Sequence, residues 1–297
     1  MTVLNWKHHT LIQALISRGP LSQTDFRHLF ATITGRTQQE NLREFNDYLL
    51  KINKELSHFQ MELRCCRDQN NGEVWYGIVN NVSDDQSKLG TKYSVPQIAF
   101  FKAILEAIVD DDTFQGAISN FQALNIRLDN RVGSDSQVEG CGAQVAPALR
   151  NFTMGQKEKT IDELVEDKWL CRLSDGSIGL GIRSYLDLRS WFLNSGVPSC
   201  DVCNEVVVKA KKCESEGCGV LIHKYCLKSK RAGRGGTGVC HGCGVQWQIG
   251  ADEDDADDDS LPRSSGSREA DLFKDVAGDA GRRHNSKRVT RSSLHLC

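Results

Sequence analysis

The sequence predicts a mainly α-helical protein with small β-hairpins, an α+β fold, arranged as four consecutive segments. Two stretches carry apolar residues at helical spacing, and each ends in residues that alternate between apolar and polar. Further along, eight residues of the types that bind metals fall within 44 positions. After Gly250 the composition changes to acids, serine, glycine and arginine. The predicted segments are residues 1–88, 89–195, 196–250 and 251–297.

Length and composition narrow the range of functions. The chain has 297 residues, of which 39% are hydrophobic, enough for two or three ordinary domains. A formal net charge of −2 gives no whole-chain argument for binding nucleic acid. No apolar stretch reaches the length that spans a bilayer, and charged residues interrupt the amino-terminal stretch, so we predict neither a membrane segment nor a signal peptide. The sequence contains no phosphate-binding loop, nucleophile elbow or H-E-x-x-H helix.

The first segment is predicted to begin with three helices. Gly19 and Pro20 end the first helix, Ser22 is a suitable N-cap for the second, and Thr37–Glu40 forms a capping box for the third. The residues expected to face the core are Leu11, Ile12, Leu15, Ile16, Phe26, Leu29, Phe30, Ile33, Leu42, Phe45, Leu49, Ile52 and Leu56. Their spacing of three and four residues is typical of one buried face on each helix.

A β-hairpin is predicted after the third helix. The apolar residues that alternate with polar ones in its first strand are Phe59, Met61, Leu63 and Cys65. A turn over Asp68–Gly72 leads into a second strand over Val74–Val79. Three helices followed by a hairpin is the element order of a winged-helix domain, so residues 1–88 are predicted to form one.

A second winged-helix domain is predicted over residues 89–195, although its sequence does not repeat the first. Its first helix is expected to start near Ser94, with Ile98, Phe101, Leu105 and Ile108 facing inward. The next predicted elements are a short helix over Phe114–Leu124, a loop over Asp129–Gly142 and a helix over Val145–Phe152. A capping-box pattern follows at Thr160–Glu163, with a helix that already includes Lys157–Lys159 as the alternative. A hairpin over Trp169–Ile182 and a closing helix over Tyr185–Leu193 complete the segment.

The third segment contains four pairs of metal-ligand residues. They are Cys200, Cys203, Cys213, Cys218, His223, Cys226, Cys240 and Cys243. A tetrahedral zinc takes four such ligands, and each closely spaced pair supplies two, so the sequence predicts two zinc ions. A disulfide scaffold is the competing interpretation, and the lack of a signal peptide disfavours it. The other cysteines are scattered and are expected to be free thiols: Cys65, Cys66, Cys141, Cys171 and Cys297.

Two ways of pairing the ligands are open. In an interleaved cross-brace, pairs one and three hold one zinc and pairs two and four hold the other. This closes large loops through metal in a segment with almost no apolar core. A sequential arrangement, in which the first four and the last four ligands each hold a zinc, also fits the spacing. His241 is a weaker ligand candidate, because Cys240 and Cys243 around it already form a well-spaced pair.

The ligand order resembles the RING and PHD superfamily of two-zinc domains. PHD fingers usually carry a tryptophan where this chain has Gly238, which favours the RING interpretation. A RING ligase uses no nucleophile of its own; it orients a charged ubiquitin-conjugating enzyme. The resemblance implies a docking patch made of Val202, Leu221, Ile222 and Leu227, with packing around the zinc sites as the alternative role. Gly244 stands where many RING domains carry a basic residue, which fits a ligase that depends on a partner.

The layout of residues 1–250 resembles one family as a whole. Besides the zinc ligands, the resemblance is carried by Trp169-Leu170, Gly181-Ile182-Arg183 and Leu188. The chain is similar to the RING-bearing non-SMC element of the nuclear SMC-type complex for DNA repair. This implies a MAGE-type winged-helix partner, a kleisin subunit and an SMC dimer, with partner-assisted ubiquitin transfer in homologous recombination on chromosomes in the nucleus. A non-catalytic assembly subunit that uses the zinc module for protein or DNA contact is the alternative.

The balance of acidic and basic residues disfavours binding of the predicted winged helices in a DNA groove. The third helix of the first unit carries Arg43, Lys51 and Lys54, but acids outnumber them. Phosphate contacts need clustered positive charge, so we favour protein docking for both units. The zinc module is more basic, between Lys209 and Arg234, and weak non-specific DNA contact there is a further hypothesis.

The last segment is predicted to be disordered. Residues 252–259 hold seven acids, and a basic group follows at Arg282–Arg288. Few apolar residues are available to offset the entropy of ordering such a segment. The basic group is a candidate nuclear-import signal, or it pairs transiently with the acids of the same segment.

Overall fold

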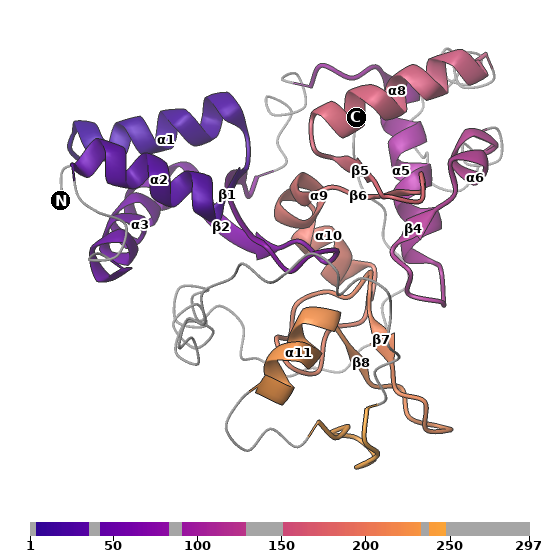
Figure 1. Ribbon diagram of the computed structural model, residues 1–297. Coiled ribbons are helices and arrows are strands. Elements are labelled where there is room, and N and C mark those ends of the chain that lie inside the picture. The colour runs from indigo at the N-terminus through magenta and orange to yellow at the C-terminus, as the bar shows by residue number, and fades with distance from the viewer. Residues whose placement is uncertain (1–3, 36–41, 83–90, 129–150, 233–237, 248–297) are drawn as a thin grey trace.

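The computed structural model describes residues 4–35, 42–82, 91–128, 151–232 and 238–247. Figure 1 shows three bodies: unit A at the left (residues 4–82), unit B at the upper right (residues 91–194), and a cysteine module below them (residues 199–247). The predicted capping box at Thr37–Glu40, the loop over Asp129–Gly142, most of the helix over Val145–Phe152 and the predicted disordered tail lie outside the described residues. In the part of the chain that the structure describes, no helix is long and apolar enough to cross a membrane.

Unit A has the winged-helix order of elements, as predicted. Its elements are α1 (Trp6–Arg18), β1 (Leu21–Ser22), α2 (Gln23–Thr34), α3 (Leu42–Leu56), the 3₁₀ turn η1 (Ser57–Phe59), β2 (Met61–Arg67) and β3 (Val74–Asn80). The three strands form an antiparallel sheet in the order β1-β3-β2, with Leu63 of β2 opposite Ile78 of β3. The two-residue strand β1 was not predicted, because two residues carry no periodic signal.

Among the residues whose burial the structure describes, the core of unit A follows the predicted apolar pattern except at Ile16 and Phe59. Leu11, Phe26, Phe45 and Ile52 are all buried. Ile16 was expected to face inward but is 54% exposed, and Phe59 was expected to begin a strand but is 75% exposed in η1. Both residues lie at the end of an apolar pattern, where one residue more or less decides which face a side chain occupies.

Unit B repeats this architecture. Its elements are α5 (Val95–Val109), β4 (Ala117–Ile118), α6 (Asn120–Leu124), α8 (Met154–Glu166), β5 (Leu170–Arg172), β6 (Ile178–Leu180), α9 (Ile182–Asp187) and α10 (Arg189–Asn194). The sheet order β4-β6-β5 matches that of unit A. The fold class predicted from the sequence, two tandem winged helices before a cysteine-rich module, is therefore confirmed.

Two predicted details of unit B, the bounds of the short helix and the closing helix, are wrong, and of the two starts predicted for the next helix the earlier one is right. The short helix covers only Asn120–Leu124, because the preceding residues form β4. Helix α8 is capped by Thr153, whereas Thr160 lies inside the helix and its hydroxyl donates to the carbonyl of Gln156 at 2.7 Å. The closing helix is broken at Leu188 into α9 and α10.

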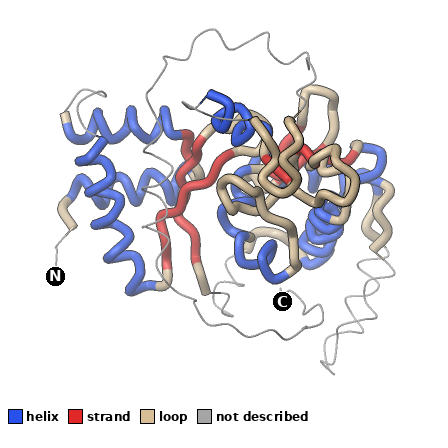
Figure 2. Tube along the Cα trace, turned by 90° about the horizontal axis from the view of Figure 1, so that it is seen from below, coloured by secondary structure: helices blue, strands red, loops and turns tan. Residues whose placement is uncertain are grey.

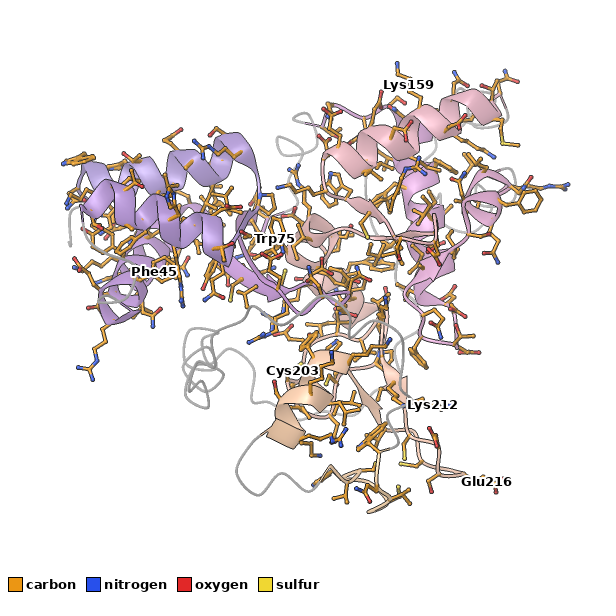
Figure 3. The ribbon with its side chains drawn as sticks, viewed as in Figure 1. Phe45, Trp75, Lys159, Cys203, Lys212 and Glu216 are labelled. Atoms are coloured by element: carbon orange, nitrogen blue, oxygen red, sulfur yellow. The ribbon has the colours of Figure 1, made fainter. Side chains whose placement is uncertain are left out.

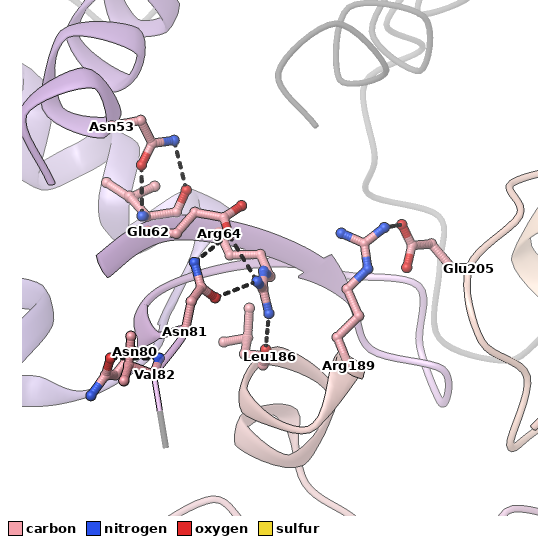
Figure 4. Close-up of polar contacts among 10 residues, drawn as sticks. Asn53, Glu62, Arg64, Asn80, Asn81, Val82, Leu186, Arg189 and Glu205 are labelled. Carbon is pink, nitrogen blue, oxygen red and sulfur yellow. Dashed lines mark hydrogen bonds and ion pairs between the residues drawn. The ribbon is translucent and has the colours of Figure 1, made fainter. Parts of the chain in front are cut away.

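The β2–β3 hairpin of unit A reaches across to unit B. Arg64 Nη1 donates to the carbonyl of Leu186 at 2.6 Å, while Nη2 contacts Glu62 and Asn81 (Figure 4). Val79 of β3 is buried in one apolar cluster with Ile182 and Leu186 of α9. The winged-helix units are thus held together by both apolar and charge-assisted contacts.

The cysteine module packs against unit B as well. It contains the short hairpin of β7 (Lys211–Lys212) and β8 (Leu221–Ile222), followed by α11 (Lys224–Ala232). Val206 and Val208 are buried in the main apolar core of unit B. A β-bridge joins Gln115 to Lys209. The module therefore shares a core with the winged helices, although its own apolar cluster is small.

Candidate metal centre

The eight predicted ligands gather into two separate groups. Within each group, one ligand atom from every residue lies within 4.8 Å of the others. Site one is made of Cys200, Cys203, His223 and Cys226, and site two of Cys213, Cys218, Cys240 and Cys243. Ligand pairs one and three therefore share a site, as do pairs two and four. This is the interleaved cross-brace, and the sequential arrangement is excluded.

Three of the four ligands of site one are buried, Cys203 is partly exposed, and the site lies on the side of the module nearer to unit A. Figure 3 shows Cys203 beneath the hairpin of unit A, whereas Glu216, in the loop that carries site two, is at the far end of the module. His223 Nδ1 lies 3.3 Å from the Cys203 sulfur and 3.9 Å from the Cys226 sulfur. Sulfurs around a tetrahedral zinc are spaced by similar distances, since each Zn–S bond is about 2.3 Å long.

Site two is closer to solvent. The Cys213 and Cys243 sulfurs lie 3.5 Å apart, and those of Cys218 and Cys240 lie 3.7 Å apart. Cys243 is exposed, whereas Cys200 and His223 of site one have no exposed surface. The two sites thus share a ligand arrangement but differ in access from outside.

The same turn holds a ligand pair in each site. The N–H of Asn204 donates to the carbonyl of Cys200 at 2.9 Å, and the N–H of Gly244 donates to that of Cys240 at 2.9 Å. The residue after each pair has a left-handed backbone, with φ of 58° at Asn204 and 73° at Gly244. Glycine and asparagine adopt this conformation at the lowest cost. The local backbone thus accounts for a glycine where many RING domains carry a basic residue.

Close packing of the ligand atoms shifts their pKa values in opposite directions. Hydrogen bonds with Cys203 and Cys226 hold the pKa of Cys200 well below its usual value. Hydrogen bonds with Cys200 and Cys203 raise the pKa of Cys226. In site two, a backbone hydrogen bond at Val245 lowers the pKa of Cys243 to about 7. Several thiolates this close together repel one another strongly, and a divalent cation that binds thiolates removes that repulsion.

The ring of His223 is fixed by a partner outside the metal site. Its Nε2 lies 3.2 Å from the carbonyl oxygen of Val206, so this nitrogen carries the proton and Nδ1 is left to face the sulfurs. A hydrogen bond from the second ring nitrogen to a carbonyl is the usual way that proteins orient a histidine ligand. The carbonyl of Val206 also accepts a hydrogen bond from Gln69 Nε2 at 2.7 Å.

Gln69 comes from the hairpin turn of unit A and is buried against the module. Its Oε1 accepts the backbone N–H groups of Val208 at 3.0 Å and Lys209 at 2.8 Å. Only 5% of the residue is exposed. A single amide side chain therefore ties unit A to the segment Val206–Lys209, whose Val206 carbonyl orients the His223 ring. The sequence contained no signal for this role, because Gln69 lies in a polar turn where most residues face solvent.

A second contact from the same turn supports site one. Tyr225 stacks on His223 with ring centroids 4.8 Å apart, and the Arg67 guanidinium lies 5.8 Å from the Tyr225 ring centroid. Gly72 lies against this tyrosine, since a Cβ built on it would be 2.9 Å from Tyr225 Cβ. The β2–β3 turn, which is the wing of unit A, thus packs against the cysteine module of the same chain.

The predicted docking residues for a conjugating enzyme differ in their exposure. Val202, between the first two ligands, is 41% exposed. Leu221, Ile222 and Leu227 are 6%, 0% and 3% exposed and pack with the buried cysteines of the module. These three residues therefore form the core of the module and offer almost no surface to a partner. Of the four, only Val202 remains a docking candidate.

The weaker ligand candidate His241 and the described cysteines that were predicted to be free thiols lie outside both sites. The exposed His241 side chain is 3.9 Å from Asp201, and His241 belongs to neither group of ligands in the described ranges. Cys65, Cys66 and Cys171 were expected to be free thiols. They are free in the structure, and burial raises the pKa values of Cys65 and Cys171 to about 11 and that of Cys66 as well. Cys141 and Cys297 are outside the described residues.

Tandem winged helices joined to a cross-braced module of seven cysteines and one histidine define a RING-like protein. A profile described as the RING-like domain matches residues 200–243. A second profile, described as the Nse1 non-SMC component of the SMC5-6 complex, matches residues 8–188. The chain therefore belongs to the Nse1 family.

Individual relatives agree with this assignment. The chain is 23% identical over 232 residues to the human non-structural maintenance of chromosomes element 1 homolog, covering 76% of this chain and 79% of that protein. It is 23% identical over 229 residues to element 1 of Schizosaccharomyces pombe, covering 76% and 87%. A solved chain from an Nse1-Nse3-Nse4 complex is similar in fold. The TM-score is 0.65 at 21% identity, over 84% of this chain and 100% of the other.

Proposed function

We propose that this chain is a subunit of a nuclear SMC-type complex and acts there as a partner-assisted RING-type ubiquitin ligase. It holds two zinc ions through the eight ligands and orients a charged ubiquitin-conjugating enzyme for transfer to a lysine. The established part of this proposal is family membership and the RING-like module. The role in homologous-recombination repair on chromosomes rests on the family resemblance.

One observation carries the ligase proposal: the exposed Val202 lies between two ligands of a cross-braced site. An apolar residue at this position is the first element of the docking patch in RING domains. Transfer by orientation needs no acid, base or nucleophile in the ligase itself. The donor set also suits zinc, because thiolates with one imidazole in two four-ligand groups are typical of structural zinc sites.

The proposed partners are a MAGE-type winged-helix subunit, a kleisin subunit and an SMC dimer. The solved chain of similar fold belongs to a complex of Nse1, Nse3 and Nse4, which supports the first two. Protein docking by the winged helices is also favoured by the position of the wing of unit A. Gln69 and Gly72 of that turn contact the cysteine module, so the turn is not free to enter a DNA groove.

A non-catalytic assembly subunit is the second candidate. It is favoured by the burial of Leu221, Ile222 and Leu227, which leaves Val202 as the one exposed residue of the four proposed for docking. Gly244 after the final ligand also favours it. In this case the cysteine module would hold the two winged-helix units in register for their partners. The contacts of Gln69 are of the kind that such a role requires.

The two candidates differ in ubiquitin discharge. Conjugating enzymes charged with ubiquitin are mixed with the chain, alone and with the MAGE-type subunit, and loss of the thioester is followed. The ligase proposal predicts that the partner accelerates discharge and that Val202→Asp abolishes the acceleration. Val95→Asp is the matched control, since Val95 is also exposed, at 54%, but lies in unit B. The assembly role would be supported if the MAGE-type subunit left the rate of ubiquitin discharge unchanged for a broad panel of conjugating enzymes. Both variants should then still bind that subunit.

A further inference from the structure

Helix α11 presents a basic face to solvent. Lys224, Lys228 and Arg231 are spaced by four and three residues, so they lie on one side of the helix, and all three are exposed. Cys226 lies on the opposite side of the helix from Lys224, and both Cys226 and Leu227 are buried in the module. Helix α11 contains no acidic residue, and no ion pair within the described ranges involves Lys224 or Arg231.

The described chain ends beside this face. The backbone N–H of Trp247 donates to the carbonyl of Gly238 at 2.9 Å, and Trp247 is only 7% exposed. A Cβ built on Gly238 would lie 3.5 Å from Arg231 Cγ. Lys230 of the same helix donates to the carbonyl of Val239 at 3.1 Å. The described part of the chain therefore ends next to the carboxyl end of α11.

The sequence after Trp247 is strongly acidic. Residues 252–259 contain seven acids, and the first of them follows Trp247 by five positions. Five extended residues span about 17 Å, while the nine residues of α11 rise about 14 Å. The acidic run can therefore reach the whole basic face without moving the module.

We propose that the acidic run at residues 252–259 docks on the basic face of α11 within the same chain. A short tether gives a local concentration in the millimolar range, so individually weak ion pairs are populated together. Dissolved salt screens the attraction between these exposed charges, so the contact is expected to weaken as the salt concentration rises. When docked, the run shields α11 from other polyanions, including a nucleic-acid backbone. This proposal is independent of ubiquitin transfer.

The basic group at Arg282–Arg288 is the competing occupant for the acidic run. More than twenty residues separate this group from the run, whereas four separate the run from Trp247. A longer loop costs more entropy to close, and pairing two unstructured segments requires ordering both of them. Helix α11 is already folded and anchored through Cys226, a ligand of site one. The fixed surface is therefore favoured.

Zero-length cross-linking of the full chain tests the contact. A carbodiimide joins carboxylates to lysine amines that lie in direct contact, and peptide mass spectrometry locates the links. At an ionic strength of about 0.01 M we expect links from residues 252–259 to Lys224 and Lys228, falling at least about threefold near 1 M salt. Lys51 of α3 is also exposed and serves as the reference lysine.

A matched pair of variants separates specific docking from general charge attraction. Lys224→Gln with Arg231→Gln removes two charges from the face and is expected to lower the Lys228 link about threefold. Lys51→Gln is expected to leave it unchanged. A mixture of isotopically light and heavy chains shows whether the links form within one chain. Dominant links to Lys287, links only between chains, or equal yields at Lys51 and Lys228 would each overturn the proposal.

Discussion

Gln69 and His223 share one hydrogen-bond acceptor, the carbonyl oxygen of Val206. Gln69 Nε2 lies 2.7 Å from this oxygen and His223 Nε2 lies 3.2 Å from it. Figure 2 shows the helices and long strands of unit A at one side and the loops of the cysteine module in front of the other elements. The shared acceptor lies where these two parts meet. Because the same carbonyl oxygen accepts a hydrogen bond from both residues, the position of unit A and the orientation of the candidate metal ligand His223 are coupled.

The first prediction follows from this coupling. Gln69→Ala removes three hydrogen bonds and leaves the buried N–H of Val208 and the partly buried N–H of Lys209 without their acceptor. Unsatisfied buried groups of this kind cost about 1–3 kcal/mol each, so we expect a loss of about 3 kcal/mol in the free energy of unfolding. Denaturant unfolding of the zinc-loaded chain measures it.

Release of zinc from site one distinguishes the coupling from a simple loss of stability. We expect chelator-induced release from this site to quicken in Gln69→Ala, while release from site two keeps its rate. Gln13→Ala, at an exposed position on α1, is the control and should change neither rate. Equal acceleration at both sites would show that Gln69 acts on the fold in general and not on the His223 ring.

The second prediction concerns the order in which the two sites lose metal. Site two includes the exposed Cys243, whereas Cys200 and His223 of site one are fully buried. A chelator should therefore release zinc in two phases, with site two first. Cys243→Ser should keep the zinc of site one, which is released in the slow phase. Cys226→Ser should keep at most the zinc of site two, which is released in the fast phase.

The energetic cost of these ligand changes is large but unequal. A structural zinc contributes on the order of 10 kcal/mol to the folding of its module. We expect Cys243→Ser to unfold only the region around site two, and native mass spectrometry should count one zinc per chain. Two ions retained in Cys243→Ser would contradict the assignment of this residue to site two.

The third prediction uses a pair of glycines in unit B. A Cβ added at Gly181 would lie 2.2 Å from the carbonyl oxygen of Lys168, and a backbone carbonyl cannot move aside. We expect Gly181→Ala to destabilise the protein by about 3 kcal/mol or more. At Gly155 in α8 no atom lies within 4 Å of an added Cβ. Gly155→Ala is expected to be neutral or to stabilise by about 0.5–1 kcal/mol, through the higher helix propensity of alanine. Thermal unfolding of both variants checks the contrast; similar melting temperatures would refute it.

The sequence carried enough information for the two winged helices and for the ligand set, for a physical reason. Helical faces such as that of α3 and the spacing of Cys200 and Cys203 are local patterns, which a single segment displays. The pairing of the sites was open, because spacing does not say which turns meet in space. The burial of Leu221 and Leu227 and the role of Gln69 depend on contacts between distant segments. No local pattern reports such contacts.

The fourth prediction is a loss of stability in unit A below neutral pH, caused by His8. This histidine is 5% exposed and stacks on Tyr48 with ring centroids 4.2 Å apart. Its Nδ1 accepts the backbone N–H of Asn5 at 3.2 Å, which closes the capping box of α1. Burial lowers the pKa of His8 below its ordinary value of 6.5, and the nearby charge of Lys51 adds to the effect.

The sign of the effect follows from proton binding. Because the pKa of His8 is lower in the folded chain, the unfolded chain takes up a proton first as the pH falls through 6.5. Stability is therefore highest above this value and falls progressively below it. Protonation also converts Nδ1 from an acceptor into a donor, so it no longer accepts the backbone N–H of Asn5 and donates instead to Asn5 Oδ1, 2.6 Å away.

His8→Gln isolates this contribution. Glutamine at the third position of a helix can accept the same backbone N–H, but it does not titrate. We expect the variant to be less stable than the wild type at pH 8, by about 1 kcal/mol, since the stack on Tyr48 is lost. The difference between the two proteins should shrink on acidification.

Hydrogen exchange of the backbone amides in α1 is the suitable measurement, because it reports on unit A separately from acid-induced loss of zinc. The exposed His58, changed to Gln, is the control, and its exchange profile should follow that of the wild type. A wild-type profile in α1 that depends on pH as weakly as that of His8→Gln would show that His8 titrates alike in the folded and unfolded chains.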